Sequence, residues 1–170
     1  KNPAWASRRT LKQQQAPIEA WLLTHHGLLK TISKIETIIT GLMDLHPSEL
    51  NRAMRSCNLL EGCQHLLLHL AQHQTIEDQI YFPKFVAIIP RLKTPMEMLD
   101  QDHIVLEQLM QDGNDVLDKL TTTRPNRTNL ARLHQITARL NRGLKTHIQH
   151  EEDIVMPDLL EIGVKRLLID

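Results

Sequence analysis

Apolar residues recur at every third or fourth position over four long stretches of the chain, which is the spacing of one buried helix face. The first predicted helix covers about residues 17–43 and begins at Pro17. The second covers about 48–81, is capped by Ser48 and bends near Gly62. The third covers about 95–121 and the fourth about 127–156, ahead of Pro157. This pattern predicts an all-α fold, an antiparallel up-down four-helix bundle.

The 170 residues suit one domain with a substantial core. We expect an N-terminal arm at 1–16, the bundle at 17–157, and a short C-terminal helix at 158–170 packed on it. Lys plus Arg and Asp plus Glu each total 20, so no net charge attracts nucleic acid or a membrane surface. No apolar run reaches the length of a membrane span. The two cysteines, Cys57 and Cys63, fit buried thiols in a reducing cytoplasm.

Histidine is unusually frequent, at ten residues, in a chain with few aromatic side chains. Three pairs place His four residues before Glu, so the two side chains share one helix face. Each pair continues the apolar stripe of its helix, and therefore points into the bundle. The pairs are His73 with Glu77, His103 with Glu107, and His147 with Glu151.

Two segments repeat one signature, "HQTIEDQIYFP" from His73 and "HIQHEEDIVMP" from His147. The chain therefore reads as two equivalent helix pairs, and the first helix should offer a counterpart of His103. Aligning His25 with His103 matches the apolar stripes better than aligning His26. We expect His25 to be the inward residue, with His26 as the alternative or as its neighbour.

Burying several imidazoles and carboxylates without partners would cost several kcal/mol per charge, and a metal ion removes that cost. Such side chains projecting inward from four helices suit a dinuclear centre. Nitrogen and oxygen donors without thiolate favour iron or manganese. Glu77 and Glu151 occupy equivalent positions in the repeat, so we expect them to bridge the two metals.

This ordered set of residues resembles the hemerythrin-like (HHE cation-binding) domains over nearly the whole chain. The resemblance implies a four-helix bundle that holds two non-haem iron ions with an oxo or hydroxo bridge; manganese and zinc are alternatives. By position, one iron takes His25 and His73, the other takes His103 and His147, and both carboxylates of Glu77 and Glu151 span the pair.

Oxygen-carrying members have a second histidine four residues after His103, where this chain has Glu107. We expect Glu107 to be a further ligand that stabilises ferric iron. The change favours a protein that senses or reacts with iron, O2, peroxide or NO. An O2 carrier, and a helical interaction domain with an incidental metal, are the alternatives, and enzymatic turnover and the protein partner stay open.

The equivalent position on the first helix is Leu29, which predicts an open coordination position on the His25 iron. Around the ligands we expect a second layer of His26, His69 and Tyr81. Glu152 directly follows a predicted bridge, and we expect it to be a solvated neighbour.

Overall fold

The structure is a computed structural model that describes residues 3–123 and 126–162, with side chains described from residue 19 to residue 158. Over these ranges the chain is helical, without a strand. In chain order the elements are α1 (Pro3–Met43), α2 (Pro47–Ser56), α3 (Leu59–Ile76), the π-helical turn η1 (Glu77–Tyr81), α4 (Phe82–Ile88), the 3-10 turn η2 (Pro90–Leu92), α5 (Lys93–Thr122) and α6 (Arg127–Ile162). The predicted all-α class is confirmed.

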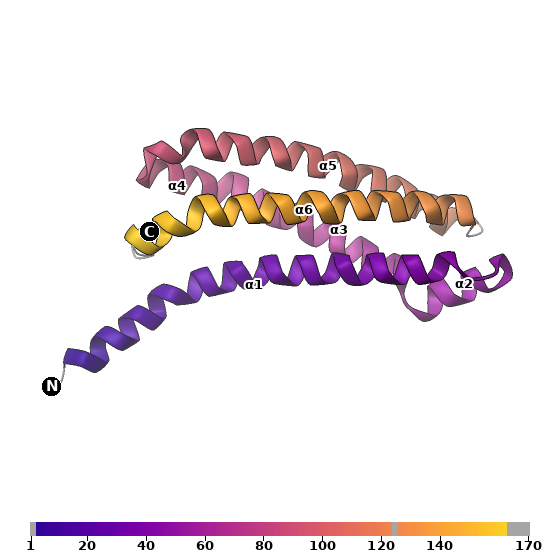
Figure 1. Ribbon diagram of the computed structural model, residues 1–170, viewed down its shortest axis with the longest axis horizontal. Coiled ribbons are helices and arrows are strands. Elements are labelled where there is room, and N and C mark those ends of the chain that lie inside the picture. Colours follow the sequence, from indigo (N-terminus) through magenta and orange to yellow (C-terminus); the bar gives the residue numbers. More distant parts are fainter. Residues whose placement is uncertain (1–2, 124–125, 163–170) are drawn as a thin grey trace.

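Helices α1, α3, α5 and α6 lie alongside one another (Figure 1). Helix α6 packs against α1 and α5, and α3 packs against the same two helices. Each long helix therefore has two long neighbours, and the four enclose a common interior. The N-terminal part of α1 projects beyond the other helices (Figure 1).

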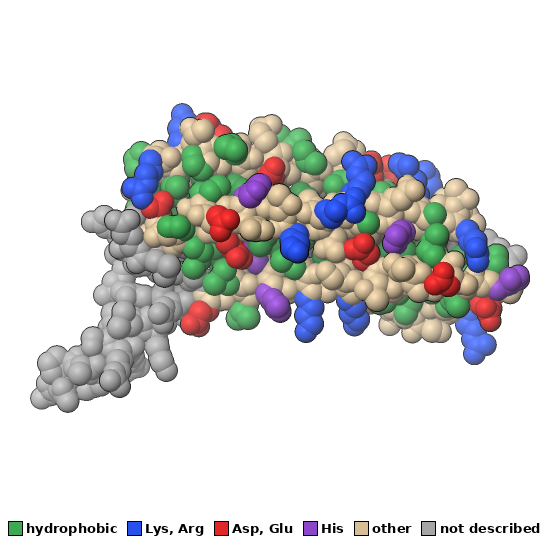
Figure 2. All heavy atoms as spheres, viewed as in Figure 1, with side chains coloured by type: hydrophobic (Ala, Val, Ile, Leu, Met, Phe, Trp, Pro, Cys, Tyr) green, Lys and Arg blue, Asp and Glu red, His purple; other side chains and the backbone are tan. Residues whose placement is uncertain are grey.

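The outer surface mixes both signs of charge. Figure 2 shows Lys and Arg side chains interspersed with Asp and Glu side chains over the visible face, without a large region of one sign. This agrees with the balanced composition. None of the described helices is both long enough and apolar enough to cross a membrane.

The predicted second helix is divided into shorter elements. Asn58 has φ 49° and ψ 39°, a left-handed conformation that asparagine tolerates better than most residues, and it separates α2 from α3. The break thus falls before the bend expected at Gly62. Helix α2 begins at Pro47, with the His46 side chain accepting a hydrogen bond from the Ser48 N–H. His46, rather than Ser48, is therefore the cap.

Two prolines that were expected to mark helix ends lie inside helices. Helix α1 begins at Pro3, so Pro17 is within it, and α6 continues through Pro157 to Ile162. The predicted C-terminal helix at 158–170 begins as the continuation of α6, and residues 163–170 lie outside the described residues. The division into arm, bundle and C-terminal helix stays a prediction.

The interior consists of two apolar clusters with a polar layer between them. The larger cluster takes α1 from Leu28 onward and α6 up to Ile148. The smaller one comprises Phe82, Phe85, Ile89, Leu92, Met96, Leu99 and Val155. Along each long helix, buried polar residues lie between these clusters, and they are His25, His73, Gln74, Glu77, His103, His147 and Glu151. The fold therefore brings most of the side chains predicted to point inward to the same level along the long helices.

Candidate metal centre

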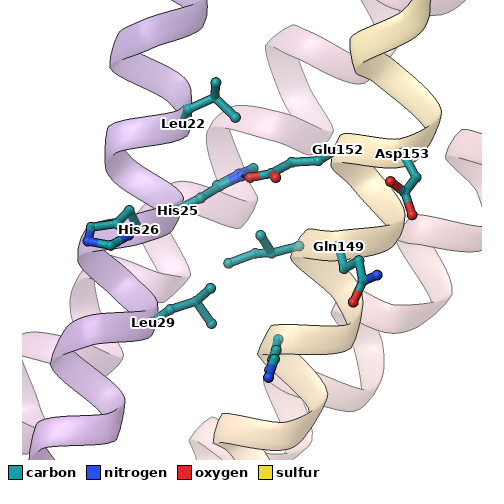
Figure 3. Close-up of a pocket in the computed structure, with 9 residues that line it drawn as sticks. Leu22, His25, His26, Leu29, Gln149, Glu152 and Asp153 are labelled. Atoms are coloured by element: carbon teal, nitrogen blue, oxygen red, sulfur yellow. Dashed lines mark hydrogen bonds and ion pairs between the residues drawn. The ribbon is translucent and has the colours of Figure 1, made fainter.

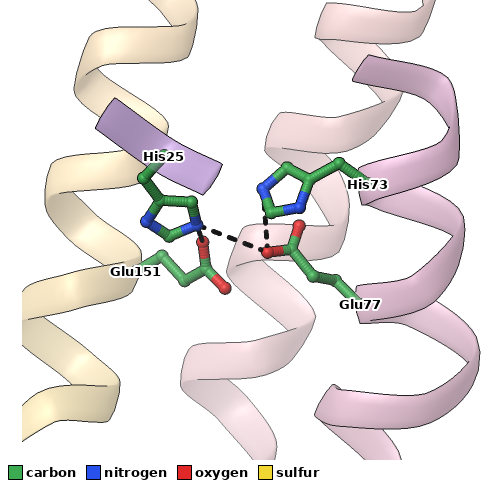
Figure 4. A group of neighbouring side chains, drawn as sticks. All are labelled: His25, His73, Glu77 and Glu151. Atoms are coloured by element: carbon green, nitrogen blue, oxygen red, sulfur yellow. Dashed lines mark ion pairs between the residues drawn. The ribbon is translucent and has the colours of Figure 1, made fainter. Parts of the chain in front are cut away.

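Six of the seven predicted ligands meet in this polar layer. Their side chains come from α1, α3 with η1, α5 and α6, and each residue is at most 7% exposed. Figure 4 shows four of them converging, with His25 and Glu151 facing His73 and Glu77. His25, and not the exposed His26, is the α1 member.

The first group of donors surrounds Glu77 and Glu151. The Nε2 atom of His25 lies 3.2 Å from Oε2 of Glu151 and 3.6 Å from Oε1 of Glu77. The same Glu77 oxygen lies 3.1 Å from Nε2 of His73. One donor atom from each of these four residues falls within 4.8 Å of the other three, which is close enough to hold a single cation.

The second group shares Glu77 with the first. Nε2 of His103 lies 3.6 Å from Oε2 of Glu77 and 3.0 Å from Nε2 of His147. Nε2 of His147 also lies 3.9 Å from Oε2 of Glu151. Glu77 thus presents one oxygen to each group, which is the arrangement that a carboxylate between two cations requires.

The donor atoms of this layer fit a metal ion. Buried nitrogen and oxygen atoms without a hydrogen-bond partner include Nε2 of His25 and His73, Oε2 of Glu77 and both carboxylate oxygens of Glu151. Leaving such atoms without a partner costs free energy, and coordination to a cation would remove that cost for several of them together. Imidazole and carboxylate together suit iron, manganese or zinc.

Protons balance the charge of this cluster when no cation does. Burial favours neutral His25, but the adjoining Glu151 and Glu77 carboxylates outweigh it and raise the pKa of His25 to about 10. Burial raises the pKa of Glu151 to about 8, with the Glu77 charge adding to it. Burial acts the same way on Glu77, yet the neighbouring His25 and His73 lower its pKa to about 2. A cation would replace the protons held here, so its binding should release them.

Three further carboxylates contact the outer nitrogens of three histidines. Oε1 of Glu152 lies 2.9 Å from Nδ1 of His25, and Oδ1 of Asp78 lies 2.7 Å from Nδ1 of His103. Oδ2 of Asp102 lies 3.6 Å from Nδ1 of His147. A carboxylate on one ring nitrogen fixes the imidazole orientation and directs the other nitrogen inward, toward a metal.

Sequence reasoning missed these three carboxylates. Glu152 was expected to be solvated, but it is only 35% exposed at the side chain and binds His25. The repeat contained the signal, because Asp78 and Glu152 are equivalent positions that each directly follow a predicted bridge. Each of the two acids serves the histidine of a helix in the other half of the chain.

Two aromatic side chains line the centre. The Trp21 ring lies 4.4 Å from that of His25, and its Nε1–H donates to Oε1 of Glu77 at 3.3 Å. The Phe82 ring stacks on His103 at 5.6 Å and an interplanar angle of 13°. The Trp21 hydrogen bond helps to explain why Glu77 accommodates a negative charge in this buried layer.

The π-helical turn η1 begins at Glu77. The Phe82 N–H donates to the Glu77 carbonyl five residues back, which adds one residue to the turn. The residues that follow are rotated relative to a regular α-helix, so Ile80 and Tyr81 are 45% and 40% exposed. Tyr81 packs beside Phe85 at 6.3 Å. Tyr81, which was expected beside the ligands, therefore lies on the partly exposed side of the turn.

Glu107 does not join the cluster. It is exposed, because after His103 the buried face of α5 continues with Leu106, three residues on, rather than with the fourth residue. Helices α3 and α6 instead continue from their histidines to the fourth residue, the buried Glu77 and Glu151. The equal His-x-x-x-Glu spacing concealed this difference. Leu29, the α1 counterpart of Glu107, is half-buried against the larger apolar cluster.

The predicted second layer of histidines is also corrected. His26 and His69 are both exposed. His26 lies next to His25 in sequence but on a different face of α1, and His69 stands one turn before His73 beside His65, with 6.4 Å between the two rings. The side chains that contact the inner histidines are carboxylates and aromatic rings instead.

Four packed helices that enclose a layer of imidazoles and carboxylates define a helical protein with a candidate metal centre. Residues 94–168 match the family model of the hemerythrin HHE cation binding domain. The match covers less than half of the chain and includes His103, His147 and Glu151. It confirms the resemblance to the hemerythrin-like family. Comparisons with curated proteins and with solved structures give no match.

Proposed function

We propose that the protein is a non-haem di-iron protein of the hemerythrin-like kind, built as an antiparallel four-helix bundle, that senses or reacts with iron, O2, peroxide or NO. One observation carries this proposal: two groups of buried donors share Glu77, and several of their atoms lack hydrogen-bond partners. The family match supports cation binding in this fold.

In the proposed centre, each iron would be held by two histidines, and Glu77 and Glu151 would be the carboxylates shared by both donor groups. His25 and His73 would hold one iron, and His103 and His147 the other. Because Glu107 is exposed, the two ions would have equal numbers of protein ligands. Both therefore offer open positions, rather than the His25 iron alone as the sequence suggested.

Bound iron would supply the electron exchange that chemistry with O2, peroxide or NO requires. The chain's own part is to orient donors and exclude water. Leu28 and Leu144 on one side of the layer and Leu99 and Val155 on the other are at most 1% exposed. Trp21 holds Glu77 by a hydrogen bond. A dry, preorganised layer of this kind strengthens every electrostatic interaction within it.

Two other functions are weaker candidates. An O2 carrier or storage protein would be expected to have a second histidine on the third helix, and Glu107 stands at that position. An interaction domain with incidental zinc or manganese would use the same donors. The main proposal includes both sensing and enzymatic turnover. The cytoplasmic location stays a prediction.

The proposal is tested by loading metal-free protein with Fe²⁺ anaerobically, admitting air and measuring bound iron by elemental analysis. We expect two iron ions per chain and the absorption of a bridged ferric pair. His147→Ala should lower the iron content. His134→Ala removes a histidine that contacts Thr40 outside the centre and should leave it unchanged. A chain that retains no iron after desalting, or retains iron without this absorption, would contradict the proposal.

Addition of peroxide separates an enzyme from a sensor. Rapid loss of added peroxide that is abolished by Glu77→Ala would establish turnover at the centre. Slow loss, with the absorption spectrum responding to peroxide, would favour sensing.

A further inference from the structure

A groove of about 380 Å³ runs between α1 and α6 and reaches the polar layer at His25. Figure 3 shows Leu22, His26 and Leu29 along its α1 side, and Gln149, Glu152 and Asp153 along α6. His25 itself is 1% exposed, so it forms the inner end of the groove rather than part of its open surface. A buried donor of the candidate centre is thus the boundary between the groove and the interior.

Glu152 links the open groove to the buried layer. Its side chain is 35% exposed, and its Oε1 contacts Nδ1 of His25 at 2.9 Å. The other nitrogen of the same ring, Nε2, lies 3.2 Å from Glu151. A cation bound by the Glu152 carboxylate would therefore be separated from the inner donors by a single imidazole ring.

His103, the equivalent histidine of the other helix pair, has an aromatic ring stacked on it. The ring of His103 is stacked against Phe82, which is 3% exposed. Asp78, the counterpart of Glu152, reaches the edge of that ring beside the stacked phenyl group. At His25 the neighbouring ring is Trp21, at 4.4 Å and tilted by 57°, and the groove lies on the α6 side of the same histidine.

We propose that the α1–α6 groove is the route by which a divalent transition-metal cation reaches the centre, with Asp153 and Glu152 as successive carboxylate contacts. This inference rests on the proposed metal centre. Glu152 is already in contact with His25, so Asp153 and Lys145 are the charges that a cation meets first, and changing either one alters the field in the groove. Because Asp153, Gln149 and Lys145 are exposed, their substitution leaves the core intact.

The first test blocks the groove and follows the rate at which metal-free full-length protein binds Co²⁺ alone, from its visible absorption after rapid mixing. Gln149→Trp should slow loading by about tenfold, because the indole must move before a cation passes. Thr146→Trp is the control, since it adds the same bulk to an exposed position of α6 that does not line the groove. It should load at the parent rate. Both variants should reach the parent's final Co²⁺ content.

The second test changes the charge of the groove without adding bulk. Asp153→Lys should slow Co²⁺ loading several-fold and Lys145→Glu should accelerate it, with both differences shrinking as salt is raised. Asp115→Lys makes the same charge change on the exposed side of α5 and should have a smaller effect.

The outcomes separate the route from the centre. If the parent chain binds no Co²⁺, the proposed metal centre fails and the route fails with it. If the parent binds Co²⁺ and both Gln149→Trp and Asp153→Lys load at the parent rate, the centre stands and the route is overturned. Thermal melting followed by circular dichroism shows whether a variant is misfolded. If Gln149→Trp is misfolded, the loading rates of Asp153→Lys and Lys145→Glu test the route instead.

Discussion

The two helix pairs, α1 with α3 and α5 with α6, present the same signature in different surroundings. Glu77 and Glu151 occupy equivalent positions, and both are 0% exposed. In the metal-free chain the pKa of Glu77 is lowered to about 2, by His25 and His73 against the effect of burial, whereas burial raises that of Glu151 to about 8. One repeat unit can therefore give a charged or a protonated carboxylate, depending on its neighbours.

The two pairs depend on one another through reciprocal contacts. Glu152 of the second pair holds His25 of the first, and Asp78 of the first holds His103 of the second. Each pair thus supplies the acid that orients a histidine of the other, and neither pair alone contains a complete set of oriented donors.

The two helix pairs differ at repeat positions that carry a different residue type in each pair. Asp102 approaches His147, whereas the equivalent Thr24 hydroxyl donates to the Ala20 carbonyl within its own helix. Trp21 donates to Glu77, and its counterpart is the apolar Leu99. These differences give each pair a distinct electrostatic environment, which substitutions can separate.

The largest expected effect is loss of the centre. Glu77→Ala and Glu151→Ala should each abolish stable binding of at least one iron, because each removes a carboxylate from between the two donor groups. Elemental analysis after loading and desalting measures this. Glu107→Ala, at the exposed position, should retain full iron content; loss of iron in that variant would restore Glu107 as a ligand.

Removal of the metal should come next. At a free metal concentration of 100 times Kd, binding contributes about 2.7 kcal/mol, which corresponds to a fall of roughly 5–10 °C in Tm when the metal is stripped. Calorimetry of loaded and stripped protein measures the shift. Equal melting temperatures would argue against a cation in the buried layer.

The reciprocal carboxylates should have smaller, matched effects. Asp78→Asn and Glu152→Gln should each weaken equilibrium metal affinity by about tenfold to a hundredfold, because each leaves one histidine without its orienting charge. Competition with a chelator measures the affinity. Asp115→Asn, on an exposed face of α5, controls for general loss of charge. A strong effect at one acid only would break the equivalence of the two pairs.

The last prediction concerns the pH dependence of the metal-free chain. Glu151 has a raised pKa in the folded state, so its ionisation opposes folding increasingly from about pH 4.5 to about 8. Glu151→Gln should therefore melt higher than the parent at pH 9 and similarly at pH 4. Glu77 has a lowered pKa in the folded state, so its ionised carboxylate stabilises the fold above about pH 4.5. This stabilisation is lost as the pH falls toward 2. Glu77→Gln should melt lower than the parent at pH 7. Melting curves in a chelator across this range test whether the signs differ.

The sequence predicted well where along the helices the centre lies. Its histidines and bridging carboxylates stand on the apolar faces of their helices, and these faces pack together when they are buried. His25, His73, His103 and His147 meet for that reason. It also placed Glu107 at the centre, where the structure does not, since the fourth residue after the histidine is buried at Glu77 and Glu151 but exposed on α5. The contacts of Asp78 and Glu152 depend on how close neighbouring helices pack, which periodicity within one helix does not contain.

The turn η1 decides which aromatic side chain lies against His103. A π-helical turn is a regular helix with one residue inserted, and each residue advances an α-helix by about 100°. Deleting Gln79 would restore a regular turn in which Phe82 stands four residues after Glu77, so Phe82 and Phe85 would keep their places in the smaller apolar cluster. At full length, a regular helix would instead bring Tyr81 to the place of Phe82. The one extra residue of η1 is therefore what pairs Phe82, rather than Tyr81, with His103.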